Sequence, residues 1–220
     1  MERKVIITSD GSSTIHLPEW DEHYHSKHGA IQEAKHVFIK NGLALFANRK
    51  INILEIGFGT GLNSFITFLE APKLSLEIDY FGVEAYPVAM EEIEKLNYTK
   101  ELNAHEFESV FKEMHQQDWK KTNIISSSFV LTKRKQFFNE ISDLEKFNLI
   151  YFDAFGARVQ PELWTEDIFK IMYKALKNGG VLVTYSAKGS VRRAMQQVGF
   201  TVERLSGPPG KREMLRATKK

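Results

Sequence analysis

The 220-residue sequence contains no cysteine, which excludes disulfide bonds and thiolate metal sites and is compatible with a reducing compartment. It also lacks any run that approaches the roughly 20 apolar residues needed by a membrane-spanning helix. The first residues lack the long apolar core of a signal peptide. We therefore expect a cytoplasmic protein with no membrane partner.

The chain has little excess charge of either sign, because 30 Lys and Arg residues nearly balance 28 Asp and Glu residues and the formal net charge is only +2. The distribution is uneven. Nine Lys or Arg residues against two acids give Lys188–Lys220 a charge of +7, which leaves −5 for the rest of the chain. This asymmetry predicts a basic face for an anionic partner, with a solvated terminal tail as the alternative.

The most informative stretch that is present is an apolar strand running directly into a glycine-rich turn and a helix. Residues 51–63 read INILEIGFGTGLN, with Gly57, Gly59 and Gly61 at alternate positions. Such a unit brings bare backbone against a nucleotide-like ligand. A P-loop would need a following Gly-Lys-Ser/Thr, and a dinucleotide fingerprint would need G-x-G-x-x-G. The G-x-G-x-G form resembles motif I of the S-adenosylmethionine methyltransferases, and a ligand-free tight turn is the alternative.

The rest of the chain alternates strands and helices after an irregular opening. Residues 1–50 predict a hairpin (5–7 and 14–17) and a cap with a helix over 30–39. Residues 51–220 predict a Rossmann-like core with a mostly helical insertion at about 97–127. We expect one α/β domain, a doubly wound sheet of the class I methyltransferase type with a C-terminal antiparallel hairpin at its edge. The other predicted strands are 78–83, 129–131, 147–152, 181–185, 201–205 and 213–217, and the other predicted helices are 87–96, 165–176 and 190–198.

Three acids fall at predicted strand ends, where ligands of open α/β sheets bind: Glu55, Glu84 and Asp153. Glu84 follows Gly61 by 23 residues, near the distance at which an acid meets ribose hydroxyls in related sheets. A carboxylate can accept both hydroxyls in bidentate fashion. Glu55 is expected to orient the glycine turn or the ammonium group of a methionine-like cofactor.

Asp153 begins the segment Asp-Ala-Phe-Gly directly after a buried strand. An amine that accepts a methyl group must present a free lone pair, and a carboxylate here can orient the amine and accept its proton. Phe155 would supply a flat wall beside the acceptor. The alternative for Asp153 is an N-cap or turn acid. The spacing of His23, His25 and His28 fits no standard zinc pattern, so we expect no metal.

Taken together, several segments resemble one family, the tRNA wobble-uridine methyltransferases of the MnmD type, which also form the N-terminal half of the bifunctional MnmC enzymes. The resemblance covers nearly the whole chain. It is carried by the glycine motif and by these segments: DGS (10–12), YHS (24–26), HVF (36–38), DAF (153–155), PELW (161–164), TYS (184–186), VRR (191–193), VGF (198–200) and KREML (211–215).

The resemblance implies methylation of the aminomethyl nitrogen of 5-aminomethyl-(2-thio)uridine at tRNA position 34, with S-adenosylmethionine as donor. It further implies action after separate enzymes that install the aminomethyl group, without a fused flavin oxidase domain. Asp153 would be the catalytic residue. The implied cofactor-binding residues are Glu55, Gly57, Gly59, Gly61, Leu62, Asn63, Glu84 and Asp153.

A wobble base is unpaired and can be splayed into a pocket, where aromatic rings can stack on it. Tyr24, Phe155 and Trp164 are the expected stacking partners, with ordinary packing as the alternative for each. Contacts with anticodon-stem phosphates would make binding depend on salt. The residues expected to make them are Lys188, Arg192, Arg193, Lys211 and Arg212.

The sequence departs from common methyltransferase patterns after the third core strand, where residues 130–136 (VLTKRKQ) contain no acid for the adenine. Backbone groups or Gln136 would then recognise it. Gly156-Ala157 also stands where related chains often have Ala-Pro. Two other functions remain open: a small-molecule amine methyl- or aminopropyltransferase, and an inactive RNA-binding module of the same fold.

Overall fold

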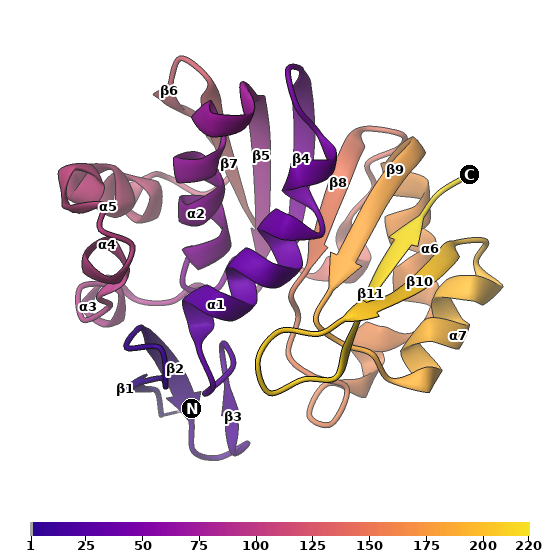
Figure 1. The fold of residues 1–220 in the computed structure, drawn as a ribbon, viewed down its shortest axis with the longest axis horizontal. Helices are drawn as coiled ribbons and strands as arrows, with labels where there is room; N and C mark the ends of the chain where they lie inside the picture. Colours follow the sequence, from indigo (N-terminus) through magenta and orange to yellow (C-terminus); the bar gives the residue numbers. More distant parts are fainter. Residues whose placement is uncertain (1) are drawn as a thin grey trace.

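The computed structural model describes residues 2–220, in which a large mixed sheet carries helices on both faces (Figure 1). The sheet has eight strands in the order β10-β11-β9-β8-β4-β5-β7-β6. Strands β7, β5, β4, β8 and β9 are mutually parallel, and β6, β10 and β11 are antiparallel to their neighbours. The strands are β4 (Lys50–Ile56), β5 (Glu77–Glu84), β6 (Thr122–Ser126), β7 (Phe129–Lys135), β8 (Phe147–Phe152), β9 (Leu176–Thr184), β10 (Thr201–Ser206) and β11 (Glu213–Thr218).

Two apolar cores form because alternate residues of each buried strand point to opposite faces. On β4, Ile51 and Ile53 pack into one core, and Leu54 and Ile56 pack into the other. Helices α1 and α2 cover the first face, and α6 and α7 cover the second. The longer helices are α2 (Leu62–Glu70), α5 (Glu108–Gln116), α6 (Glu166–Ala175) and α7 (Gly189–Gln197); the shorter ones are α1 (Ala30–Ala34), α3 (Met90–Ile93) and α4 (Tyr98–Glu101).

The expected fold class is confirmed, and the corrections to it are local. Within the segment expected to be mostly helical, α4 and α5 are helices, but residues 122–126 form β6, which pairs with the edge strand β7. The helix expected over 87–96 is only the single turn α3. The helix expected over 30–39 is α1 continued by a π-helical turn, Lys35–Lys40. No helix within residues 2–220 is long and apolar enough to cross a bilayer.

The N-terminal segment folds over one edge of the large sheet. Strands β1 (Lys4–Ile7), β2 (Ser13–Leu17) and β3 (Glu22–His23) form a small antiparallel sheet, and Figure 1 shows it below the ends toward which β8 and β9 point. These are the carboxyl ends of the parallel strands, where ligands of such sheets bind. The side chain of Asn97, just before α4, holds the hairpin, because it accepts the Ser13 amide at 2.8 Å and donates to Gly11 O at 2.9 Å.

The chain reverses its direction of winding at β4, which lies between β5 and β8. The gap beyond the carboxyl ends of β4 and β8 is therefore the topological switch point. The register pairs Ile56 with Phe152, so the segments that begin at Gly57 and Asp153 leave the sheet side by side. The amide of Asp153 donates to Ile56 O at 2.9 Å.

Gly82 on β5 provides the space in which the glycine turn rests. A Cβ atom at this position would lie 2.3 Å from the Phe58 ring. We predict that Gly82→Ala lowers the free energy of unfolding by about 1–3 kcal/mol, because overpacking forces the ring or the strand to move. Urea denaturation measures this change. Gly156→Ala is the control, since its nearest neighbour would be the Tyr185 hydroxyl at 3.7 Å. Equal loss in both variants would contradict the account.

Candidate active site

The glycine turn leads from β4 into α2 with all three glycines at positive φ: 87° at Gly57, 50° at Gly59 and 70° at Gly61. Glycine adopts such angles at no steric cost, because it has no Cβ atom. A Cβ atom on Gly57 would lie 2.7 Å from Asp153 O, and one on Gly59 would lie 3.1 Å from the Tyr24 ring. The missing side chains therefore allow the turn to pack against the loop after β8 and against the N-terminal cap.

Glu84 ends β5 with its carboxylate held by backbone amides. Its Oε2 accepts the Gly59 amide at 3.1 Å, and its Oε1 accepts the Tyr86 amide at 2.9 Å. Each carboxylate oxygen has a second acceptor position. Because the side chain lines the main cavity described below, the positions left over suit a pair of hydroxyl groups.

Asn63, in the first turn of α2, connects two carboxyl groups. Its Nδ2 donates to Glu55 Oε1 at 3.0 Å and to Asp153 Oδ2 at 2.8 Å. Burial raises the pKa of Glu55 well above its ordinary value, and the hydrogen bond from Asn63 opposes this rise. Burial, reinforced by the negative charge of Glu33, raises the pKa of Asp153 to about 7. Asp153 is thus a group that changes its protonation state near neutral pH.

The loop that carries Asp153 is held from two sides through its carbonyl groups. The Tyr185 hydroxyl donates to Ala154 O at 2.8 Å, and Trp164 Nε1 donates to Phe155 O at 2.8 Å. Trp164 is 5% exposed and packs against Phe152. Its ring lines neither of the two cavities described below, so the structure favours packing over the expected stacking on a base.

The main cavity has a volume of about 1120 Å³ and lies over the switch point. Of the residues expected to bind cofactor, Gly57, Gly59, Asn63, Glu84 and Asp153 line it. The other three do not line it. Glu55 and Leu62 are buried, and the space beside Gly61 is filled by the His115 ring.

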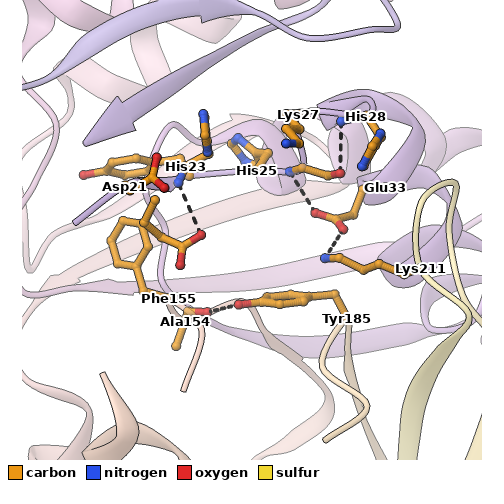
Figure 2. A pocket seen from close by; sticks show the side chains of 13 residues that line it. Asp21, His23, His25, Lys27, His28, Glu33, Ala154, Phe155, Tyr185 and Lys211 are labelled. Atoms are coloured by element: carbon orange, nitrogen blue, oxygen red, sulfur yellow. Dashed lines mark hydrogen bonds and ion pairs between the residues drawn. The ribbon is translucent and has the colours of Figure 1, made fainter. Parts of the chain in front are cut away.

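A second cavity, the side pocket, has a volume of about 310 Å³ and lies between the cap, the loop after β8 and the loop between β10 and β11 (Figure 2). It shares Tyr24, His25, Ala154 and Phe155 with the main cavity. The rings of Tyr24 and Phe155 meet edge to face with centroids 5.0 Å apart. These two expected substrate-binding residues therefore lie where the two cavities meet.

The basic residues expected to contact phosphates do not all lie together. A groove of about 590 Å³ contains Lys188, Lys211 and Arg212, together with Arg204, which the sequence analysis did not select. Arg192 and Arg193 lie on α7 and do not line this groove. Lys211 pairs with Glu33, so it is not a free surface cation.

The three histidines of the cap, His23, His25 and His28, all line the side pocket but make different contacts. His23 stacks on His16 with ring centroids 4.5 Å apart, and His25 contacts the Thr14 hydroxyl at 3.3 Å. Burial lowers the pKa of His25 to about 4, so its ring is neutral at physiological pH. Within residues 2–220 no three His, Asp or Glu side chains are placed to hold a metal ion.

Sequence reasoning missed several residues that line the main cavity. Phe138 and Asn139, just after β7, line it, and so do Tyr86 and Arg3. Gln136, which was expected to recognise the adenine, does not line the cavity, and its backbone amide donates to Glu84 O at 3.3 Å. The only sequence signal for Phe138 and Asn139 was position, since they follow β7, the third parallel strand of the core.

The residues of the main cavity fit S-adenosyl-L-methionine. Asn63 Oδ1 is buried and has no hydrogen-bond partner among the described residues, so it can accept a bond from an ammonium group of a ligand. Glu84 suits ribose hydroxyls, and Tyr86 and Phe138 offer aromatic surface for a base. The sheet order, the glycine turn and these acids together define a class I methyltransferase.

Comparison with known proteins identifies the family. A model of the S-adenosyl-L-methionine-dependent methyltransferase family matches residues 96–220, more than half of the chain. The chain belongs to this family, and S-adenosyl-L-methionine is its cofactor.

The chain is similar to two proteins described as tRNA 5-methylaminomethyl-2-thiouridine biosynthesis bifunctional protein MnmC. It is 30% identical over 204 residues to that of Nitrosospira multiformis (87% of this chain, 33% of the relative). It is 28% identical over 214 residues to that of Idiomarina loihiensis (89% and 35%). The chain thus spans about a third of the length of these relatives.

Among solved structures, MNMC2 from Aquifex aeolicus superposes with a TM-score of 0.80 at 23% identity and covers 100% of this chain and 70% of that one. Spermidine synthase from Thermotoga maritima gives a TM-score of 0.53 at 15% identity, with 99% and 73% covered. At these identities the likeness shows the shared fold alone.

We predict that Glu84→Ala weakens binding of S-adenosyl-L-methionine by roughly 10- to 100-fold, the loss expected for hydrogen bonds to a charged group. Isothermal titration calorimetry measures this affinity. Glu77→Ala, at the opposite end of β5, is the matched control and should bind as the unaltered protein does. Unchanged affinity in Glu84→Ala would exclude this carboxylate from the cofactor site.

Proposed function

We propose that the protein methylates the aminomethyl nitrogen of 5-aminomethyl-(2-thio)uridine at tRNA wobble position 34, giving 5-methylaminomethyl-(2-thio)uridine. The relatives named for biosynthesis of this nucleoside support the choice of acceptor. The observation that carries the proposal is the position of Asp153. This residue lines the main cavity, and the loop that it begins forms one wall of the side pocket.

The cofactor supplies a methyl group on a positively charged sulfur. The protein must therefore hold the substrate amine with a free lone pair and in the correct direction of approach. An ammonium ion that arrives beside the ionised form of Asp153 can lose a proton to it, directly or through water. Asn63 fixes the position of the accepting carboxylate, since its amide donates to Asp153 Oδ2. The carbonyl bonds from Tyr185 and Trp164 keep the loop in place during this transfer.

Aromatic and basic groups of the described residues suit an RNA acceptor. The Phe155 ring is partly exposed at the meeting point of the two cavities, where an extruded base can lie against it. The groove containing Lys188 and Arg212 continues from the side pocket, because both cavities are lined by Tyr185 and Lys211. Phosphates of an anticodon stem would occupy this groove.

The direct test incubates the protein with radiolabelled S-adenosyl-L-methionine and tRNA from cells blocked at the aminomethyl stage. We expect label in 5-methylaminomethyl-2-thiouridine after nucleoside analysis. Asp153→Ala should lose it, and Asp167→Ala, an exposed acid on α6, should retain it. Label only in added small amines would favour a small-molecule transferase. Cofactor binding without any transfer would favour an inactive RNA-binding module.

The pKa of Asp153 predicts a specific pH dependence. The ionised form accepts the proton, so the single-turnover rate should rise with pH through about 7. Loss of a proton from the substrate ammonium group also raises the rate with pH. The Asp153→Asn variant separates the two effects. That variant should lose about 10²- to 10⁴-fold in rate and keep only the dependence due to the amine. A wild-type profile without the limb near pH 7 would contradict this role.

A further inference from the structure

The wall of the side pocket contains an ion pair that the proposed reaction leaves unexplained. Glu33, from α1 in the cap, pairs with Lys211, from the loop between β10 and β11 (Figure 2). Their side chains are 8% and 30% exposed. Taking two charges out of water costs free energy that their mutual attraction often fails to offset. The pair therefore calls for a role beyond stability.

Both partners keep hydrogen-bonding capacity. Glu33 accepts the Ser26 amide at 3.1 Å through Oε1 and Lys211 through Oε2. Each of these oxygens has a second acceptor position, and an ammonium group has three donors. Lys211 Nζ lies 3.9 Å from the centroid of the Tyr185 ring, which holds it at the pocket wall. The pair thus offers a donor and an acceptor next to each other.

The pair is also close to the reacting group. Its charges act on Asp153 with opposite signs, Glu33 raising and Lys211 lowering the pKa of that carboxyl. Tyr185, against which Lys211 lies, donates to Ala154 O next to Asp153. A molecule that enters from the basic groove would meet Lys211 before it reaches Asp153.

We propose that the side pocket receives the acceptor base, and that Lys211 and Glu33 recognise the hydrogen-bonding edge of a uracil-type ring. Lys211 donates to the O4 carbonyl, and Glu33 accepts the N3–H group. The C5 substituent is then directed past Phe155 toward Asp153. This inference rests on the proposed function, since it assigns the pocket for that acceptor.

The geometry favours a base over a phosphate at Lys211. A phosphate bound to Lys211 would lie beside the Glu33 carboxylate, and the two neighbouring negative groups would repel each other. A neutral base edge carries no such charge, and its N–H satisfies the carboxylate. Lys188 and Arg212, which line only the groove, remain the residues for phosphates.

The test compares two anticodon stem–loops, one with 5-aminomethyluridine and one with an abasic residue at position 34. Fluorescence anisotropy with S-adenosylhomocysteine present measures both affinities. Lys211→Met should weaken binding of the first by roughly 5- to 100-fold, the range for one well-placed base contact, and leave the second unchanged. Lys188→Met, the matched control, should weaken both equally. Equal weakening of both by Lys211→Met would show a phosphate contact and overturn the proposal.

A charge exchange separates recognition from a structural role. The double variant Glu33→Lys with Lys211→Glu keeps an ion pair but exchanges donor and acceptor. If it melts near the wild-type temperature, we expect it to lose the preference for the base-containing stem–loop; retention of that preference would overturn the proposal. If it fails to fold, Glu33→Met, which has no oxygen to accept the N3–H group, decides in the same assay: loss of the preference supports the proposal, and an unchanged preference overturns it. Failure of the proposed function is seen separately, as wild-type protein that transfers no methyl group to tRNA.

Discussion

The amide of Asn63, held between the carboxyl groups of Glu55 and Asp153, is the interaction on which the rest of the site depends. One NH₂ group has two donors and satisfies one oxygen of each acid. Two carboxyl groups so near each other resist ionising together. Burial raises the pKa of Glu55 well above its ordinary value and raises the pKa of Asp153 to about 7. The position of Asp153 thus follows from one side chain of α2, whereas its raised pKa follows mainly from burial.

The surroundings of Asp153 are built by segments far apart in the sequence. The cap reaches the C-terminal hairpin at two further points besides the Glu33–Lys211 pair. His36 Nε2 lies 2.7 Å from Ser206 O, and the absence of a side chain at Gly210 makes room for the His28 ring. The cap therefore closes the side pocket against the hairpin. A base that enters the pocket would be surrounded by the first and last parts of the chain.

The sequence predicted those features that local pattern determines. The glycine turn, the strand-end positions of Glu84 and Asp153 and the alternation of strands and helices each need only a short window of residues. The class I fold follows from them and is confirmed. The prediction of a helical segment was wrong at β6, because a polar edge strand pairs on one side only and has weak apolar periodicity.

Roles that depend on long-range contacts were beyond local pattern. Trp164 looks the same in sequence whether it meets a base or donates to Phe155 O. Lys211 belongs to a basic segment, but its partner Glu33 precedes it by 178 residues. Phe138 and Asn139 line the cavity only because β7 ends beside β5. The assignment of individual site residues stays a prediction until it is tested with ligands.

The most direct measurement is a crystal structure with S-adenosylhomocysteine and an anticodon stem–loop carrying 5-aminomethyluridine. The account predicts that the aminomethyl nitrogen lies within hydrogen-bonding distance of Asp153 and that the base lies in the side pocket against Phe155. A base bound elsewhere, with its amine remote from Asp153, would contradict the account.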